Sequence, residues 1–273
     1  MRSESDLRVA IAGLGTIGKV IATKLDSGDI PGCRLSAVCG RDPAKTSAFI
    51  DGLATAVPSV ALGELAAHAD IVVECAPAHL LREIVEPAVK AGKKVIVLSV
   101  GALLEHPDLL DKRNFAPGGQ IMVPTGALLG LDAVTAAAEG KIQSVRMISR
   151  KPPIGFKGAP FLAENNIDIE NLDKPLKLFD GTAREAAKGF PANLNVSVAL
   201  SLAGIGPDQT FLEVWADTTV TRNTHRIEVV SDSAMLHMTI ENIPSENPKT
   251  GRITAQSVVA MLRKLSSPVR VGT

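Results

Sequence analysis

Two patterns of apolar residues in the sequence predict an α/β protein with two domains. In the first half, short runs rich in Val and Ile alternate with helical patterns, which is typical of a doubly wound parallel sheet covered on both faces. After Pro124, three strand candidates follow one another closely at 209–216, 224–231 and 234–240, which favours an α+β domain with a mostly antiparallel sheet. A chain of 273 residues suits two modest domains.

The elements follow in order along the chain. In the first domain, strands are expected at 7–12, 34–39, 70–74, 93–99 and 120–123, with helices at 17–25, 43–50 and 79–91. In the second, a helix at 125–138 and a strand at 141–149 precede an irregular segment, 150–180, with four prolines between 151 and 175. A helical pattern at 183–203 breaks at Phe190-Pro191, and a last helix is expected at 253–264. We therefore expect domains at 1–124 and 125–251, with the helical segment 252–266 packing back on the first domain.

A complete G-x-G-x-x-G motif joins the first strand to the first helix. It reads Gly13-Leu14-Gly15-Thr16-Ile17-Gly18. Gly13 allows the tight turn, Gly15 lets backbone approach a pyrophosphate, and Gly18 lets helix and strand pack closely. The pyrophosphate then lies at the helix N-terminus, where free N–H groups and the dipole favour an anion. The motif predicts a Rossmann domain that binds a dinucleotide through Gly13, Gly15, Thr16, Ile17 and Gly18.

The end of the second strand bears on the choice between NAD and NADP. An acidic residue about 20 residues after the motif would bind the ribose 2′-hydroxyl, but Gly40 and then Arg41 stand there. A guanidinium without a carboxylate suits a 2′-phosphate, so Arg41 is a candidate cofactor contact and NADP is expected to be tolerated. The alternative is a solvated Arg41, with Asp42 capping the next helix before Pro43.

Two further strand ends are expected at the cofactor crevice. Ala76 follows the third strand and Ser99 ends the fourth, and ligands of open α/β sheets bind at the carboxyl ends of strands. Ala76 and Ser99 are therefore candidate cofactor contacts. Glu74 and Cys75 either line the same crevice or simply cap the strand end.

Histidine is the usual proton-transferring group near neutral pH. Of five histidines, only His225 lies in a dense polar cluster, Thr221-Arg222-Asn223-Thr224-His225-Arg226, at the start of a strand. His225 is the candidate catalytic residue, and a hydrogen-bonded strand histidine is the alternative. Other polar residues in apolar surroundings are candidates for holding a substrate; they are Arg150, Lys151, Asn193 and Thr224. The alternatives are surface charges for the two cations and helix capping for Asn193.

Composition excludes several classes of protein. Lys plus Arg and Asp plus Glu both number 29, and aromatic residues make up 3%, so a nucleic-acid partner is not expected. The three cysteines show no metal spacing, so no metal is expected and the thiols fit a reducing compartment. Charges precede the first apolar run, and Pro, Gly or Asn break the two long uncharged stretches. We therefore expect a cytoplasmic protein with no membrane partner.

Motifs along nearly the whole chain resemble the L-aspartate dehydrogenase family. Besides the glycine motif they are Pro124-Thr-Gly-Ala-Leu-Leu-Gly-Leu-Asp132, Ser149-Arg-Lys-Pro-Pro153, Gly181-Thr-Ala-Arg-Glu185, Phe190-Pro-Ala-Asn-Leu-Asn-Val196, Ala203-Gly-Ile-Gly206, Trp215-Ala-Asp217 and Asn223-Thr-His225. The resemblance implies that His225 is catalytic and that Ala127 and Asn195 contact the cofactor. Thr218 departs from the family, where a proline often follows the Ala-Asp pair.

The same resemblance implies an NAD- or NADP-dependent oxidoreductase acting on a CH–NH2 donor. It implies interconversion of L-aspartate with oxaloacetate and ammonia through iminoaspartate, and a homodimer formed with the open sheet of the second domain. The small-molecule reaction would serve either NAD biosynthesis or aspartate catabolism. Two alternatives remain. One is another oxidoreductase of this build, similar to dihydrodipicolinate reductase or homoserine dehydrogenase, and the other is an NAD(P)-sensing protein without catalysis.

Overall fold

The computed structural model describes residues 6–191, 194–244 and 251–273, so Asn193 lies outside the described residues. The chain divides into two compact units. The first comprises residues 1–124 and 255–271, and the second comprises 125–254 and 272–273. Each unit has its own five-stranded sheet.

The first sheet is entirely parallel. Its strands are β1 (Leu7–Ala12), β2 (Cys33–Cys39), β3 (Ile71–Glu74), β4 (Lys94–Val97) and β5 (Gln120–Met122). They lie in the order β2-β1-β3-β4-β5, which confirms the predicted doubly wound sheet. Because the second and third strands lie on either side of the first, the strand order reverses beside β1, where such sheets bind ligands.

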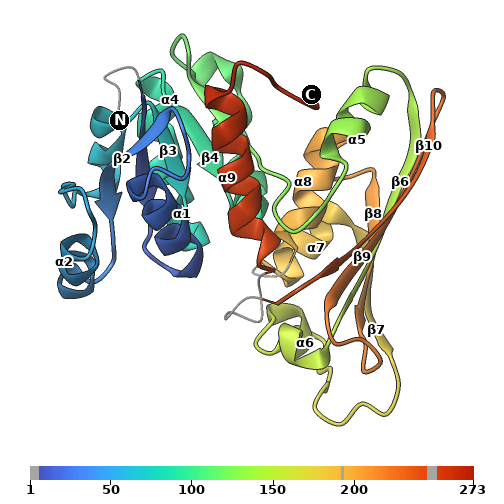
Figure 1. Cartoon of the computed structure of the whole chain (residues 1–273). Coiled ribbons are helices and arrows are strands. Elements are labelled where there is room, and N and C mark those ends of the chain that lie inside the picture. Colours follow the sequence, from blue (N-terminus) through green and yellow to red (C-terminus); the bar gives the residue numbers. More distant parts are fainter. Residues whose placement is uncertain (1–5, 192–193, 245–250) are drawn as a thin grey trace. The chain divides into compact units, whose positions relative to one another are not determined.

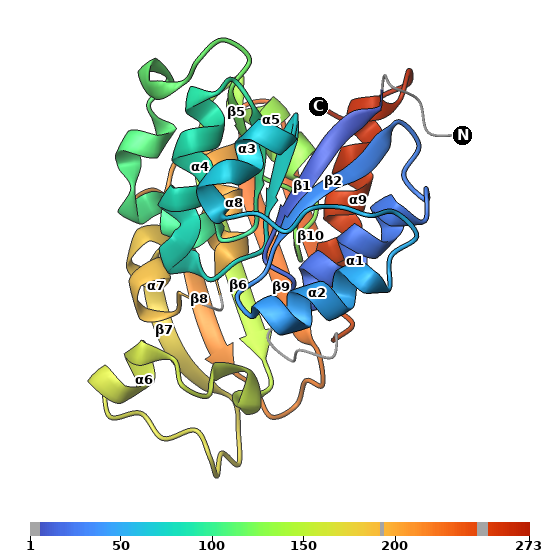
Figure 2. The same ribbon diagram turned by 90° about the vertical axis from the view of Figure 1, so that its left-hand side faces the viewer.

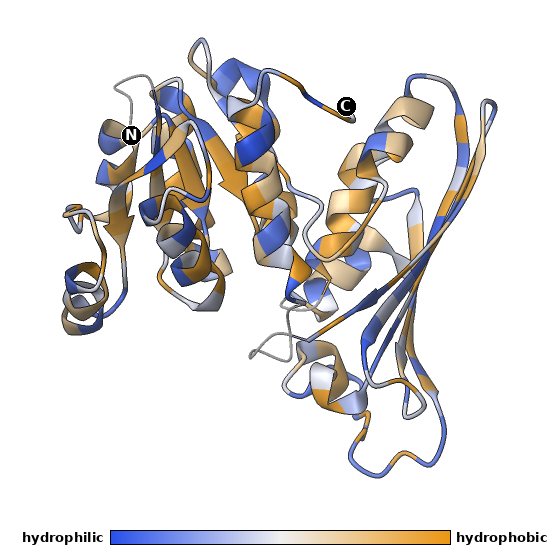
Figure 3. Ribbon diagram, in the orientation of Figure 1, coloured by the Kyte–Doolittle hydropathy of each residue, from blue (hydrophilic) through white to orange (hydrophobic). Residues whose placement is uncertain are grey.

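Helices connect these strands. They are α1 (Thr16–Asp26), α2 (Pro43–Asp51), α3 (Leu65–His68) and α4 (Leu81–Lys90), the last preceded by a 3-10 turn at Ala78–Leu80. The runs 9–12 of β1 and 71–73 of β3 are entirely apolar, and Figure 3 colours much of this sheet as hydrophobic, because both faces of the sheet are covered. Val9, Ile11 and Val73 are buried in the core with Ile21 and Leu25 of α1.

The helix α9 (Ile253–Ser266) returns to this first unit. Its Val258 and Leu262 are fully buried in the same apolar core as β1. The Cys33 thiol contacts the carbonyl of Leu262 at 3.8 Å, and the Ser266 hydroxyl donates to the carbonyl of Pro31 at 2.7 Å. Figure 2 shows α9 beside β1, β2 and α1. A segment from the far end of the chain thus completes the apolar core of the first unit.

The second sheet is mixed and mostly antiparallel, as predicted. Its strands are β6 (Ile142–Lys151), β7 (Leu176–Thr182), β8 (Thr210–Ala216), β9 (Asn223–Ser231) and β10 (Met235–Asn242), in the order β10-β9-β6-β8-β7. Only β6 and β8 pair in parallel among these neighbours. The helices α5 (Leu131–Ala138), α7 (Ala183–Gly189) and α8 (Asn195–Ala203) cover one face (Figure 1). That face buries Val145 and Met147 of β6 and Ile227 and Val229 of β9.

Three expectations were wrong in their extent. The strand expected at 141–149 continues to Lys151. The segment expected to be irregular up to residue 180 contains α6 (Pro160–Glu164) and most of β7. The helix expected from residue 125 begins only at Leu131, because Gly126 and Gly130 adopt positive φ of 60° and 67°, which a helix excludes. Within the described residues, no helix combines the length and apolarity that a membrane span requires.

Candidate functional site

The glycine-rich turn has the geometry of a phosphate cradle. Gly13 has φ of 101°, and a Cβ there would lie 2.5 Å from the carbonyl oxygen of Cys75. A Cβ on Gly18 would lie 1.9 Å from the carbonyl oxygen of Gly13, whereas one on Gly15 would meet no atom within 4 Å. Gly15 is the N-cap of α1, which Thr16 and Ile17 open. The space beside the Gly15 backbone at this helix N-terminus is therefore clear of other atoms, and this fits a pyrophosphate.

Packing explains the missing carboxylate at the end of β2. A Cβ on Gly40 would lie 2.0 Å from the hydroxyl oxygen of Thr46, and that hydroxyl donates to the carbonyl of Asp42 at 2.8 Å. The Asp42 carboxylate accepts from the Lys45 amide at 3.1 Å and so caps α2. Arg41 is exposed beside it. This edge of the unit therefore presents a cation, because Gly40 has no room for a side chain and Asp42 is engaged.

The carboxyl ends of β3 and β4 meet at one buried carboxylate. Glu74 is 0% exposed and accepts hydrogen bonds from Ala76 and Ser99, the two predicted cofactor contacts of this edge. Burial raises the pKa of the Glu74 carboxyl, and the four hydrogen bonds it accepts oppose that rise. Ala76 and Ser99 are thus brought together through Glu74.

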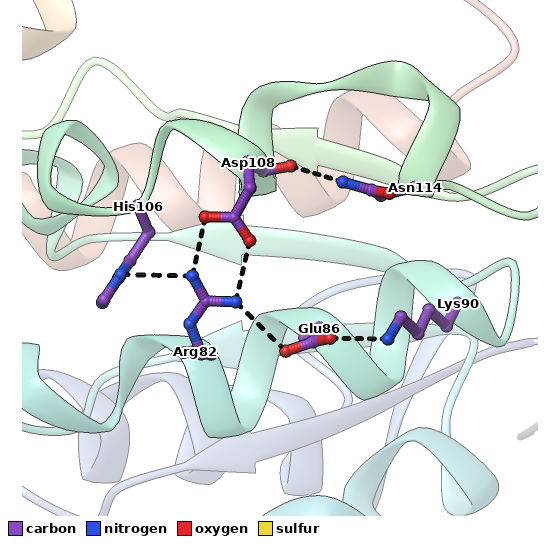
Figure 4. A network of polar contacts seen from close by, with 6 residues as sticks. All are labelled: Arg82, Glu86, Lys90, His106, Asp108 and Asn114. Atoms are coloured by element: carbon purple, nitrogen blue, oxygen red, sulfur yellow. Dashed lines mark hydrogen bonds and ion pairs between the residues drawn. The ribbon is translucent and has the colours of Figure 1, made fainter.

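A polar network fixes the segment that follows Ser99 (Figure 4). The Arg82 guanidinium of α4 donates to both Asp108 oxygens, at 2.8 and 2.7 Å, and to Glu86 at 3.3 Å. Its Nη2 also lies 3.4 Å from His106 Nδ1, and the Asn114 amide donates to the carbonyl of Asp108 at 2.8 Å. The three short 3-10 turns between Val100 and Asn114 are thereby tied to α4.

Polar side chains replace apolar ones at one end of the covered face of the second sheet. Ser149 of β6 pairs directly with His225 of β9, and Lys151 follows two residues later, on the same face. Ser149, Lys151 and His225 are 0%, 3% and 2% exposed. Neither the Ser149 hydroxyl nor His225 Nδ1 has a hydrogen-bond partner within the described residues. Buried polar atoms without partners are costly and mark a site prepared for a ligand.

Burial lowers the pKa of both titratable groups in this cluster, His225 and Lys151. Desolvation, and then the nearby charge of Lys151, lower the pKa of His225 from 6.5 to about 3. Desolvation lowers the pKa of Lys151 from 10.5 to about 8, and its ammonium lies 5.7 Å from the centre of the Phe156 ring. At neutral pH His225 is therefore an uncharged imidazole, which can accept a proton, beside a cation.

Asn242 extends the same polar face to the loop that carries Ala127. Asn242 ends β10, pairs with Asn223 and is 3% exposed. Its amide nitrogen donates to the carbonyl of Ala127 at 2.9 Å, while its Oδ1 has no partner within the described residues. Sequence reasoning missed both Asn242 and Ser149. Strand pairing brings both residues to the face of His225. Ser149 opens one of the motifs quoted above, whereas no local pattern singles out Asn242.

The other predicted substrate contacts lie elsewhere. Arg150 pairs with Thr224 across β6 and β9, and these residues alternate with Lys151 and His225, so they point to the opposite face. The Arg150 guanidinium donates to Asp217 at 2.8 Å and lies 4.6 Å from the Trp215 ring centre. Asn195 is the first residue of α8 and is partly exposed. The structure thus brings Lys151, but not Arg150 or Thr224, to the side of His225. Among the described residues, no group of three His, Cys, Asp or Glu side chains could hold a metal ion.

Each of the two units matches a known protein family. Residues 13–123 match the family described as homoserine dehydrogenase, NAD binding domain, and residues 132–265 match aspartate dehydrogenase, C-terminal. The first unit therefore carries an NAD-binding domain.

Curated relatives match over nearly the full chain. L-aspartate dehydrogenase 3 of Bordetella bronchiseptica is 71% identical and covers 100% of both chains. L-aspartate dehydrogenase of Bradyrhizobium diazoefficiens is 63% identical over 99% of this chain and 96% of the relative. The crystal structure of aspartate dehydrogenase from Thermotoga maritima shares the fold, with a TM-score of 0.71 and 22% identity over 97% and 99% of the two chains. The family predicted from the sequence motifs is confirmed: this chain belongs to the L-aspartate dehydrogenase family.

Proposed function

We propose that the protein is an NAD(P)-dependent L-aspartate dehydrogenase in which His225 transfers the proton. The observation that carries the proposal is the buried polar cluster of Ser149, Lys151 and His225, with two polar atoms unpartnered among the described residues, in a chain that also has an open glycine-rich turn. The reaction interconverts L-aspartate with oxaloacetate and ammonia through iminoaspartate. Gly13, Gly15, Gly18, Ala76 and Ser99 would hold the dinucleotide, and Ala127 and Asn195 are the further cofactor contacts that the family resemblance implies.

Lys151 is the group we propose for one substrate carboxylate. It is the cation on the face of His225, whereas Arg150 lies on the opposite face, where it pairs with Asp217. A buried ammonium attracts a carboxylate more strongly than an exposed one, because water screens the pair less. A dianionic substrate also offsets the positive charge that Lys151 brings to a largely buried site.

His225 acts on the water that hydrolyses the imine. A nicotinamide cofactor, when bound, would supply the oxidation as the acceptor for a hydride from Cα of aspartate. The neutral imidazole accepts a proton as water adds to the imine carbon, and it returns a proton to the nitrogen as the C–N bond breaks and ammonia leaves. A substrate carboxylate beside His225 raises the low pKa of that imidazole, since a nearby anion favours the imidazolium. The reverse reaction uses the same group to protonate a leaving hydroxyl.

Steady-state kinetics test the proposal. Activity is measured with aspartate, and with oxaloacetate plus ammonium, each with NAD and NADP cofactors. His225→Ala is expected to lower turnover by about 10²–10⁴-fold. Lys151→Met is expected to raise KM for the dicarboxylate more than it lowers kcat. Near-normal turnover in His225→Ala refutes its role, and activity with other keto acids alone would favour an oxidoreductase of another specificity. Cofactor binding without any turnover would indicate a sensor.

Location and assembly belong to the same proposal. We expect a cytoplasmic homodimer that has no nucleic-acid or membrane partner. Within the described residues no helix covers the face of the second sheet that carries Arg150 and Trp215 (Figure 1), and this supports the use of that sheet between subunits. NADP use is supported by the exposed Arg41 beside Gly40, where packing excludes a side chain.

A further inference from the structure

We propose that Glu74 is a positioning residue for the dinucleotide: its carboxylate holds the ends of β3 and β4 in register with the glycine-rich turn, so that three strand ends present one rigid edge to the cofactor. Glu74 does not itself need to touch the cofactor. It acts through Ala76, Ser99 and Gly13, whose backbone atoms form that edge.

Each Glu74 oxygen accepts two hydrogen bonds. Oε1 accepts from the Ala76 amide and the Ser99 hydroxyl, both at 3.0 Å. Oε2 accepts from the amides of Leu98 and Ser99, at 3.0 and 2.8 Å. One side chain on β3 therefore fixes its own loop and the loop that follows β4.

The glycine-rich turn packs against the segment that Glu74 holds. A Cβ on Gly13 would lie 2.5 Å from the Cys75 carbonyl oxygen and 2.9 Å from the Ala76 nitrogen. The Cys75 amide also donates to the carbonyl of Ala12 at 2.8 Å, immediately before the turn. The Cys75–Ala76 peptide thus packs against Gly13 on one side and is hydrogen-bonded to the Glu74 carboxylate on the other. A displacement of that peptide would displace the turn as well.

Burial argues that this arrangement serves more than the stability of the fold. Glu74 is 0% exposed at the end of a strand whose other residues are Ile71, Val72 and Val73. Removing a carboxylate from water costs free energy even when it is well hydrogen-bonded, and an apolar residue would continue the strand without that cost. The carboxylate lies where strand order reverses beside β1, which is the place where this fold binds its ligand.

The test compares two substitutions that each remove a charge from a buried carboxylate of the same unit. In Glu74→Gln, an NH2 group replaces one of the two oxygens. Facing Leu98 and Ser99 it meets two backbone donors and loses both hydrogen bonds; facing Ala76 it loses that amide's hydrogen bond, while the Ser99 hydroxyl can turn and accept. At least one of the four hydrogen bonds is therefore lost whichever way the amide turns. The matched control is Asp26→Asn. Asp26 lies at the C-terminal end of α1, 8% exposed, and accepts from the amides of Ala54 and Thr55 at 2.7 and 3.0 Å.

The readout is the Kd of NADH and NADPH, titrated by fluorescence without aspartate, together with the melting temperature by circular dichroism. Glu74→Gln is expected to raise the cofactor Kd by about tenfold or more, and in turnover to raise cofactor KM more than it lowers kcat. Asp26→Asn is expected to lower the melting temperature while leaving the Kd within about twofold of the parent value. Because the titration contains no substrate, it remains valid even if the enzyme acts on another amino acid.

Two results would overturn the proposal. One is a folded Glu74→Gln protein that binds NADH and NADPH as tightly as the parent. The other is an equal rise in Kd for both variants, which would mean that lost stability alone weakens binding. If Glu74→Gln does not fold, Glu74→Asp replaces it, since it keeps the charge but withdraws the carboxylate by one methylene. An unchanged Kd in that variant counts equally against the proposal.

Discussion

The buried neutral state of His225 should make the second unit sensitive to acid, and His225→Gln should remove that sensitivity. His225 is 2% exposed and its pKa is lowered from 6.5 to about 3. Between these two values the unfolded chain binds a proton that the folded unit does not bind. Stability is therefore fully present above pH 6.5 and falls as the pH decreases toward 3. Glutamine is polar and does not titrate in this range, so the variant lacks this contribution.

The magnitude follows from the two pKa values. A group that stays neutral in the folded state loses about 1.4 kcal/mol of stability for each pH unit below its unfolded pKa. At pH 5, which is 1.5 units below 6.5, His225 costs about 2 kcal/mol of unfolding free energy relative to pH 8. Other titrating groups are the same in both proteins, so the difference between the two pH profiles isolates this term.

The assay is denaturation by urea at pH 8 and pH 5, followed by tryptophan fluorescence. Trp215 is the single tryptophan of the chain and lies on β8, in the sheet that holds His225. The parent protein should lose about 2 kcal/mol more than His225→Gln between the two pH values. Parallel pH profiles for the two proteins would refute the reasoning, because they would mean that His225 is protonated in the folded state or is not buried.

Three further predictions concern the glycine-rich turn, Arg41 and the loop before α5. Gly15→Ala should leave the melting temperature unchanged, because φ at Gly15 is −77° and a Cβ there meets no atom within 4 Å. If that space takes the pyrophosphate, the same variant should raise the NADH Kd by about tenfold or more. An unchanged Kd would contradict this assignment. Arg41→Ala should raise KM for NADP by about tenfold while sparing NAD, since it removes one charge-assisted contact, and equal effects on both cofactors would count against a 2′-phosphate contact. Gly130→Ala should lower the unfolding free energy by about 1–2 kcal/mol more than Gly126→Ala. Both glycines have positive φ, but only at Gly130 would a Cβ approach Met238, to 2.2 Å, and equal losses in the urea assay would show that this contact yields without cost.

Local signals in the sequence were sufficient for the first unit. The alternation of apolar strands with helices and the spacing of Gly13, Gly15 and Gly18 are each readable within a few residues. The structure adds what neighbouring elements contribute. Thr46 excludes a side chain at Gly40, and Glu74 joins two strand ends. Neither relation has a sequence pattern, because each depends on residues that meet only in three dimensions.

In the second unit the sequence was less informative about the site. The polar cluster around His225 was evident. The strand expected at 141–149, however, continues to Lys151 as β6. That extension assigns Lys151 and Arg150 to opposite faces, which a loop would not do. Asn242 lies 17 positions beyond His225 in the printed sequence and reaches the same face only because β9 and β10 pair in register. The edge strand β7 was missed because Phe179, Asp180 and Gly181 interrupt its apolar alternation.

The return of α9 to the first unit has a consequence for the order in which the protein is made. The core around β1 includes Val258 and Leu262. The residues of β1 are synthesised first, but these two core residues of α9 are synthesised only after the whole of the second sheet. The ribosome has by then released every strand of the second unit, which can fold while the nucleotide-binding core is still open. An arrest of translation before Ile253 would thus leave a folded second unit attached to an incomplete first one, with its apolar core exposed to chaperones and proteases.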